Sequence, residues 1–180
     1  MKPTEDLVHD HTVILHMLSG AERLVQSIRS TRTVDVTKVE QVIDFSRQFT
    51  DRCHHSKEEK CLFVRLQERG LPADQGPIAV MLHEHRVGRE LIRGIESALK
   101  EHQTGNQKAI DSLTETLQRY IDLLRAHIAK ENNVLFPMSD RFLTADDQKS
   151  LEDSFKHIEE HEVGKDVHEK YHRMAHEIAE

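Results

Sequence analysis

Apolar residues recur three and four positions apart along most of this chain, a spacing that places them on one face of an α-helix. Only 7 glycines and 4 prolines occur among the 180 residues, so few positions interrupt the pattern. The alternation of apolar and polar residues that marks a half-buried strand is almost absent. The sequence therefore predicts an all-α protein whose long helices each bury one stripe of side chains.

Four long helices with short connections are predicted over residues 1–143, and this arrangement favours an up-down-up-down four-helix bundle. Their approximate bounds are Thr4 to Arg29, Asp35 to Arg69, Pro77 to His102 and Gln107 to Pro137. Proline lacks the backbone N–H that a helix interior needs, so the fourth helix is expected to end at Pro137.

Residues 144–180 are predicted to form a C-terminal helical extension packed on the bundle. Thr144 is followed by acidic residues that suit the first turn of a helix. Gly164 divides that helix from a last segment, which extends to Ile178.

Charge and hydropathy limit the partners and the compartment. Asp and Glu number 32 against 25 Lys and Arg, giving a net charge of −7, so no nucleic-acid partner is expected. No apolar run approaches the roughly 20 residues needed to span a bilayer, and the start of the chain lacks a signal-like apolar core. Cys53 and Cys61 lie about 12 Å apart on a predicted helix, too far for a disulfide. A cytoplasmic protein without membrane contact is expected.

Histidine accounts for 14 residues, which indicates metal binding or proton transfer. One His-x-x-x-Glu pair alone would more often be a solvated pair on a helix surface. Here the pair occurs in both halves of the chain, as His54 with Glu58 and as His127 with Glu131, and Leu-Phe follows four residues after each glutamate. His11 and His85 continue the apolar stripes of the first and third predicted helices.

The repeat predicts a metal site inside the bundle. A lone buried carboxylate is costly unless it is paired or bound to a cation, and this chain places two of them on buried stripes. Carboxylates that bridge two metal ions, with imidazoles completing each coordination sphere, meet that requirement. The candidate ligands are His11, His54, Glu58, His85, His127 and Glu131.

Taken together, these motifs resemble those of the hemerythrin-like (HHE cation-binding) domain family over roughly residues 5 to 160. The motifs are Asp10-His11, His54-His55-Ser56-Lys57-Glu58-Glu59, Glu84-His85, and His127-Ile128-Ala129-Lys130-Glu131 before Leu135-Phe136-Pro137. The resemblance implies a four-helix bundle around two non-haem Fe ions. It further implies that Glu58, Glu131 and an oxo species bridge these ions, and that the four histidines are terminal ligands.

Two departures favour the bacterial, non-oxygen-carrying branch of that family. The oxygen carriers have a pair of histidines four apart on the third helix, whereas Met81 and Arg89 flank His85 here. Their last motif ends in Asp one residue later than Glu131. One coordination position is therefore expected to be open or filled from elsewhere, and His168, Tyr171 or His172 of the tail is a candidate fifth donor. His55 and Glu59 are expected to flank the ligands.

Other readings remain open at the level of sequence. His16 is an alternative to His11, and His168 to His172 fits the H-E-x-x-H pattern of zinc peptidases. A ferritin-like di-iron site would need two Glu-x-x-His motifs, and only Glu169 to His172 fits. Gly88, near His85, would pack against a neighbouring helix or leave room for a diatomic ligand.

The function expected from the resemblance is binding of O₂, NO or peroxide for sensing, scavenging or storage. A sensor would need a separate protein partner, because 180 residues leave no output domain. The alternative is a di-iron enzyme that detoxifies peroxide or NO, or that delivers iron for iron-sulfur cluster repair. A metal-free helical interaction module is the third possibility.

Overall fold

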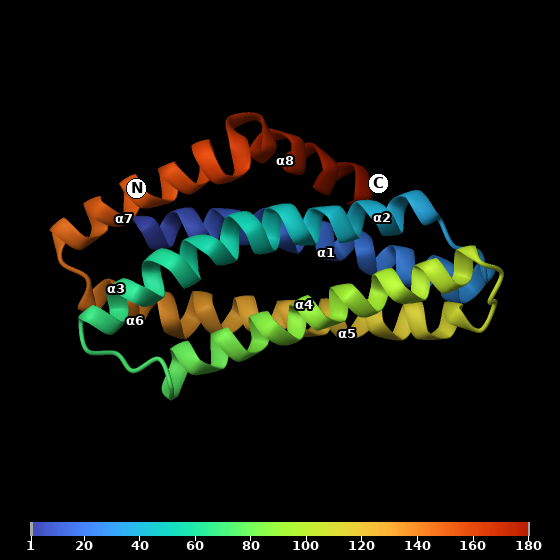
Figure 1. The fold of residues 1–180 in the computed structure, drawn as a ribbon, viewed down its shortest axis with the longest axis horizontal. Helices are drawn as coiled ribbons and strands as arrows, with labels where there is room; N and C mark the ends of the chain where they lie inside the picture. The colour runs from blue at the N-terminus through green and yellow to red at the C-terminus, as the bar shows by residue number, and fades with distance from the viewer. Residues whose placement is uncertain (1, 180) are drawn as a thin grey trace.

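A computed structural model describes residues 2–179, except for the side chains of residues 162 and 165–168. Four helical rods lie side by side and alternate in direction (Figure 1). The first rod is α1 (Pro3–Thr31), and the third is α4 (Gly76–Gln103). No strand occurs among the residues that the structure describes. The predicted all-α bundle is confirmed.

The second and fourth rods contain wide, π-helical turns. The second runs through α2 (Val36–Phe45), η1 (Ser46–His55), η2 (Glu58–Leu62) and α3 (Phe63–Glu68). The fourth runs through α5 (Ala109–Lys130), η3 (Glu131–Leu135) and α6 (Phe136–Phe142). Such turns close through i→i+5 hydrogen bonds and are frequent at functional sites.

The prediction that the fourth helix ends at Pro137 is wrong, because helical structure continues to Phe142. The N–H of Phe136 bonds to the carbonyl of Glu131, five residues back, so the wide turn of η3 finishes just before the proline. Pro137 then falls in the first turn of α6, where a missing N–H breaks no hydrogen bond.

The buried apolar residues form two clusters at opposite ends of the bundle. On α1, Leu7 belongs to the smaller cluster and Ile14 to the larger. On α4, Met81 belongs to the smaller cluster and Leu91 to the larger. The candidate ligands His11 and His85 therefore lie in the stretch between the two clusters, where the interior is polar.

The last part of the chain contributes α7 (Ala145–His157), η4 (Ile158–Gly164) and α8 (Lys165–Ala179). Thr144 caps α7: its hydroxyl accepts a hydrogen bond from the Asp147 N–H, and the Asp147 carboxylate accepts one from the Thr144 N–H. In Figure 1 these helices cross above α1 and α2. Ile178 of α8 is buried in the larger cluster. The division of the chain at residue 143 stays a prediction.

Replacing Gly20 with alanine should detach the end of α8 from α1. A Cβ at this position would lie 2.6 Å from the carbonyl carbon of Ile178, so backbone rather than a flexible side chain would have to move. We expect a loss of about 1–3 kcal/mol in the free energy of unfolding, as for other overpacked sites. Urea denaturation measures the change.

The control is Gly88→Ala, also within a helix, whose Cβ would meet only side chains at 3.9 Å. It should hold or raise stability, because alanine is the better helix former by up to about 1 kcal/mol. Equal effects of the two substitutions would contradict the close packing of α8 on α1.

No helix in the described part of the chain combines the length and the apolar character that a membrane crossing requires. Cys53 and Cys61 are both free thiols. The cytoplasmic location stays a prediction.

Candidate metal centre

The structure brings together all six candidate ligands from the four rods. His11 comes from α1 and His85 from α4, while the second and fourth rods each supply a histidine and a glutamate. Every one of the six is at most 1% exposed. The two His-x-x-x-Glu pairs of the sequence repeat thus face each other across the bundle interior.

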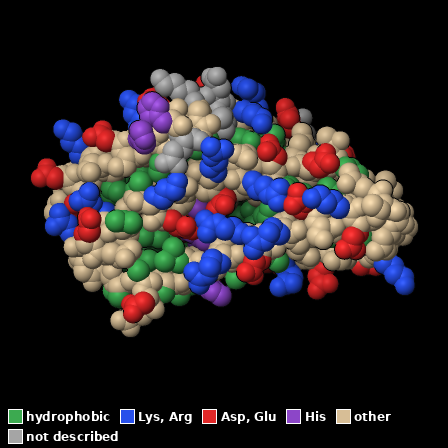
Figure 2. Space-filling model, viewed as in Figure 1, with side chains coloured by type: hydrophobic (Ala, Val, Ile, Leu, Met, Phe, Trp, Pro, Cys, Tyr) green, Lys and Arg blue, Asp and Glu red, His purple; other side chains and the backbone are tan. Residues whose placement is uncertain are grey.

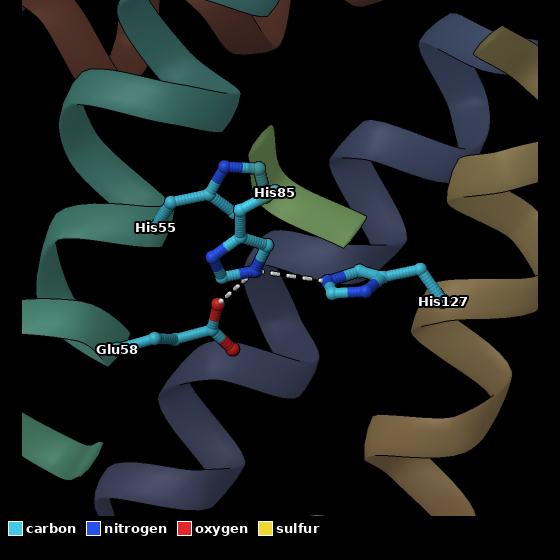
Figure 3. Close-up of side chains that lie close together, drawn as sticks. All are labelled: His55, Glu58, His85 and His127. Carbon is cyan, nitrogen blue, oxygen red and sulfur yellow. Dashed lines mark hydrogen bonds and ion pairs between the residues drawn. The ribbon is translucent and has the colours of Figure 1, made fainter. Parts of the chain in front are cut away.

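The four imidazoles form two pairs that meet through their Nε2 atoms. The Nε2 atoms of His11 and His54 lie 3.0 Å apart, and those of His85 and His127 lie 3.1 Å apart. Figure 3 shows the second pair beside Glu58. Nitrogen atoms at this separation, with their lone pairs directed into one space, suit two ligands of a single metal ion.

Each carboxylate reaches both pairs of imidazoles. The two oxygens of Glu131 lie 3.2 Å from His11 and 3.2 Å from His127. Those of Glu58 lie 3.6 Å from His54 and 3.4 Å from His85. Each histidine pair therefore faces one oxygen from each glutamate, which is the donor arrangement for two ions bridged by two carboxylates.

The donor set fits cations. None of the four carboxylate oxygens of Glu58 and Glu131 accepts a hydrogen bond of acceptable geometry from any described residue. Fully buried carboxylates without hydrogen bonds are costly, and metal ions remove that cost. Imidazole and carboxylate together are typical ligands of iron and zinc rather than of calcium or magnesium.

The pKa values of His127 and Glu131 are both shifted toward the charged forms. Burial lowers the pKa of His127, but the charge of Glu131 and the hydrogen bond to Glu84 outweigh it and raise the pKa to about 10. Burial also raises the pKa of Glu131, yet the charges of His127 and His11 hold it well below its usual value. Metal binding at His127 would therefore displace a proton.

A hydrogen-bond partner orients each of the four rings. In every case the Nδ1 atom faces an oxygen of a neighbouring side chain, so an Nδ1–H donor leaves Nε2 free to bind a metal. The pairs are His11 with Asn132 at 2.7 Å, His54 with Asp10 at 3.3 Å, His85 with Glu59 at 2.7 Å, and His127 with Glu84 at 2.9 Å.

A lysine or arginine side chain forms an ion pair with each of the three acidic residues that orient a histidine. The ammonium of Lys57 lies 2.9 Å from Asp10, Arg89 lies 2.9 Å from Glu59, and Lys130 contacts Glu84. Lys57 itself is completely buried, and it also pairs with Asp6 at 3.0 Å and with Glu159 of η4 at 2.5 Å. Through Glu159 the last part of the chain contacts the residues that orient His54.

Replacing Glu84 with glutamine should weaken metal binding by roughly 10–100-fold, as expected when a residue that orients a ligand is changed. The amide is neutral and presents either its oxygen or its NH₂ to His127, so the ring loses its charged acceptor. Competition with a chromophoric chelator measures the affinity. Glu90→Gln, an exposed change on the same helix, is the matched control and should bind metal as the parent protein does.

The wide turns begin at the two glutamates. The N–H of Phe63 bonds to the carbonyl of Glu58, just as that of Phe136 bonds to Glu131. The two phenyl rings cover the imidazoles: Phe63 stacks on His85 at 6.1 Å and Phe136 on His11 at 5.4 Å. Apolar rings thus shield the candidate ligands from water on this side.

The tail residues that were candidate donors lie elsewhere. The Tyr171 hydroxyl donates to Asp44 at 2.9 Å, and the His172 ring lies 5.7 Å from that of His9. The side chain of His168 is outside the described residues. His16, the alternative to His11, lies beside His176 rather than in the polar interior.

His55 is the fifth imidazole next to the site. Its ring stacks on that of His85 at 3.8 Å, and it shares a cluster of possible ligand atoms with Glu58, His85 and His127 (Figure 3). The motifs predict His55 and Glu59 as residues that flank the ligands, and Glu59 does orient His85. They give no signal for Asn132, or for the burial of Lys57, whose type normally indicates the surface.

Comparison with known proteins identifies the family of this chain. Residues 2–139 match the family model of the hemerythrin HHE cation binding domain. The chain belongs to the hemerythrin HHE family. This membership agrees with two buried His-x-x-x-Glu pairs that face one another across a helical bundle.

Several bacterial proteins are similar to this chain in sequence. An uncharacterized protein of Mycobacterium tuberculosis is 23% identical over 160 residues, or 89% of this chain and 62% of the relative. The iron-sulfur cluster repair protein YtfE of Edwardsiella ictaluri is 31% identical over 115 residues, or 63% of this chain and 52% of YtfE. The YtfE of Escherichia coli SMS-3-5 is 35% identical over 91 residues, or 47% and 39%.

The chain thus spans less than two thirds of the length of these relatives. No solved structure matches it.

Proposed function

We propose that this protein holds two non-haem iron ions between its two histidine pairs and binds O₂, NO or peroxide there, for sensing, scavenging or storage. His11 and His54 would hold one ion, and His85 and His127 the other. Glu58 and Glu131 would bridge them. The observation that carries the proposal is the pair of buried carboxylates, each with one oxygen directed toward each pair of imidazoles.

Bound iron would supply the redox chemistry and the affinity for the small ligand. The chain supplies position: Asn132, Asp10, Glu59 and Glu84 fix the imidazole rings through Nδ1. The phenyl rings of Phe63 and Phe136 limit the access of water to the candidate ligands. No general acid or base is needed for binding alone.

Metal analysis of protein produced in iron-replete medium, together with its absorption spectrum, tests the proposal. We expect about two irons per chain, as the family resemblance implies, and absorption bands of ferric iron with anionic ligands. One zinc per chain would instead support the H-E-x-x-H reading of the tail. Protein that carries no metal after purification and takes up none on addition of ferrous iron would contradict the proposal.

The second candidate function is delivery of iron for iron-sulfur cluster repair, or enzymatic removal of peroxide or NO. The similarity to YtfE proteins, which are named for cluster repair, favours delivery. Incubating the iron-loaded protein with a peroxide-damaged cluster enzyme measures repair, and peroxide and NO electrodes measure turnover. A protein that only binds would form a stable adduct, restore no cluster and consume no ligand.

A further inference from the structure

A cavity of 260 Å³ opens between η1 and α4, on the side of the bundle that faces the viewer in Figure 2. Lys and Arg side chains, with Asp and Glu side chains among them, surround this hollow. None of the six candidate metal ligands lines it, but His55 does, and the His55 ring stacks on His85. The cavity is thus separated from the candidate metal centre by one imidazole.

Hydroxyl groups form the polar part of the wall. Ser46 and Thr50 are each only 2% exposed, and neither hydroxyl makes a hydrogen bond of acceptable geometry with any described residue. The phenol of Tyr120 lies beside them: burial raises its pKa, so it stays a neutral hydroxyl group. Buried hydroxyls are normally paired, and each can both donate and accept, so these groups can hydrogen-bond a polar occupant of the cavity.

The charge of the wall comes from three arginines, two of which are already paired. Arg47 forms a double hydrogen bond with Glu96 at 2.7 and 3.2 Å, and Arg89 contacts Asp51 and Glu59. Arg93 forms no ion pair within the part of the chain that the structure covers. Asp51 also lines the cavity and is paired with Arg89, so the exposed Arg93 is the lining arginine that remains available to an anion.

The remaining wall is apolar and closely limits the size of an occupant. Ile92 and Leu124 line it, and Gly88 contributes a surface without a side chain. A ligand that suits the whole wall has one negative charge and a planar pair of oxygens, which can accept hydrogen bonds from a guanidinium group and from the hydroxyls. It also has a short apolar part that can contact the apolar wall.

We propose that this cavity is a binding site for a short-chain carboxylate, from acetate to butyrate in size. Arg93 supplies the balancing charge, and the Ser46 and Thr50 hydroxyls donate hydrogen bonds to the carboxylate. The alkyl part packs on Ile92 and Leu124. The site is separate from the proposed iron ligands, so its occupancy and the iron content can be tested independently.

Calorimetric titration of the full-length purified protein with acetate and with butyrate tests this proposal. We expect saturable binding of one carboxylate per chain. Arg93→Ala, and the double change Ser46→Ala with Thr50→Val, should each weaken binding at least about tenfold, since hydrogen bonds to charged groups contribute that much. Gly88→Val, which fills the cavity, should weaken it similarly. Arg119→Ala, an exposed arginine of α5 outside the cavity, should change nothing.

Two further comparisons separate this site from other binding modes. A carboxylate that coordinates a metal ion directly would keep its affinity in the cavity variants, and that result would overturn the proposal. Sulfate, a dianion without an apolar part, should bind at least about tenfold more weakly than acetate, because it cannot pack on Ile92 and Leu124 and its two charges are costlier to remove from water. Equal affinity for sulfate would overturn the carboxylate assignment. Circular dichroism of each variant excludes loss of fold as the cause of weak binding.

Discussion

Replacing Glu58 with glutamine should reduce the metal content of the purified protein from about two ions per chain to well below one. The carboxylate presents one oxygen to each histidine pair, so a single change affects both ions. Glutamine has the same shape, but it offers one neutral oxygen and an NH₂ group that repels a cation. The loss of affinity should exceed the roughly 10–100-fold expected for a residue that only orients a ligand.

Elemental analysis after desalting measures this effect, and Glu131→Gln should reproduce it. Glu90→Gln again serves as the control, because it removes an equal charge from the surface of α4. Circular dichroism should show the same helix content in all three variants, since the two apolar clusters are untouched. Two ions per chain in Glu58→Gln would mean that the carboxylates do not bridge, and the proposed centre would have to be abandoned.

Removing the metal should lower the melting temperature by at least about 5–10 °C, the effect expected for one ion. An ion present at 100 times its dissociation constant stabilises the folded state by about 2.7 kcal/mol. For a chain of this length each kcal/mol corresponds to about 2–4 °C. Calorimetry with and without a strong chelator measures the difference, and added ferrous iron should restore the original value.

The Glu58→Gln variant provides the comparison for this experiment too. Its melting temperature should be insensitive to the chelator, because it holds little metal to lose. An unchanged melting temperature in the parent protein would favour a helical interaction module without a metal requirement.

The grouping of the six candidate ligands could be predicted because local spacing determines most of it. His54 and Glu58 lie four residues apart on one helix, a distance that the helix geometry fixes at about 6 Å. The same spacing in His127 and Glu131 then indicated that two such faces meet inside a bundle. His11 could be identified because it takes a position on an apolar stripe. None of these inferences required knowledge of how one helix is placed against another.

The orienting residues could not be predicted because they depend on placement between helices. Glu84 serves His127 on the next rod rather than its neighbour His85, and Glu59 serves His85 rather than a residue of its own helix. Lys57 is buried only because acidic groups from α1 and η4 surround it. The continuation of the helix beyond Pro137 depends on a wide turn that no residue type signals.

The wide turns that start at Glu58 and Glu131 have a consequence for the angular order of residues around each rod. In a regular α-helix, a residue five positions on is rotated by about 140° from the first, since each residue advances about 100°. A turn closed by an i→i+5 bond contains more residues per turn, so that residue lies closer to the face of the first. Phe63 and Phe136 can therefore face the same interior as the glutamates. Loss of one residue from either turn would rotate the aromatic ring away and expose an imidazole. The number of residues between each glutamate and its phenylalanine is therefore as constrained as the residue types themselves.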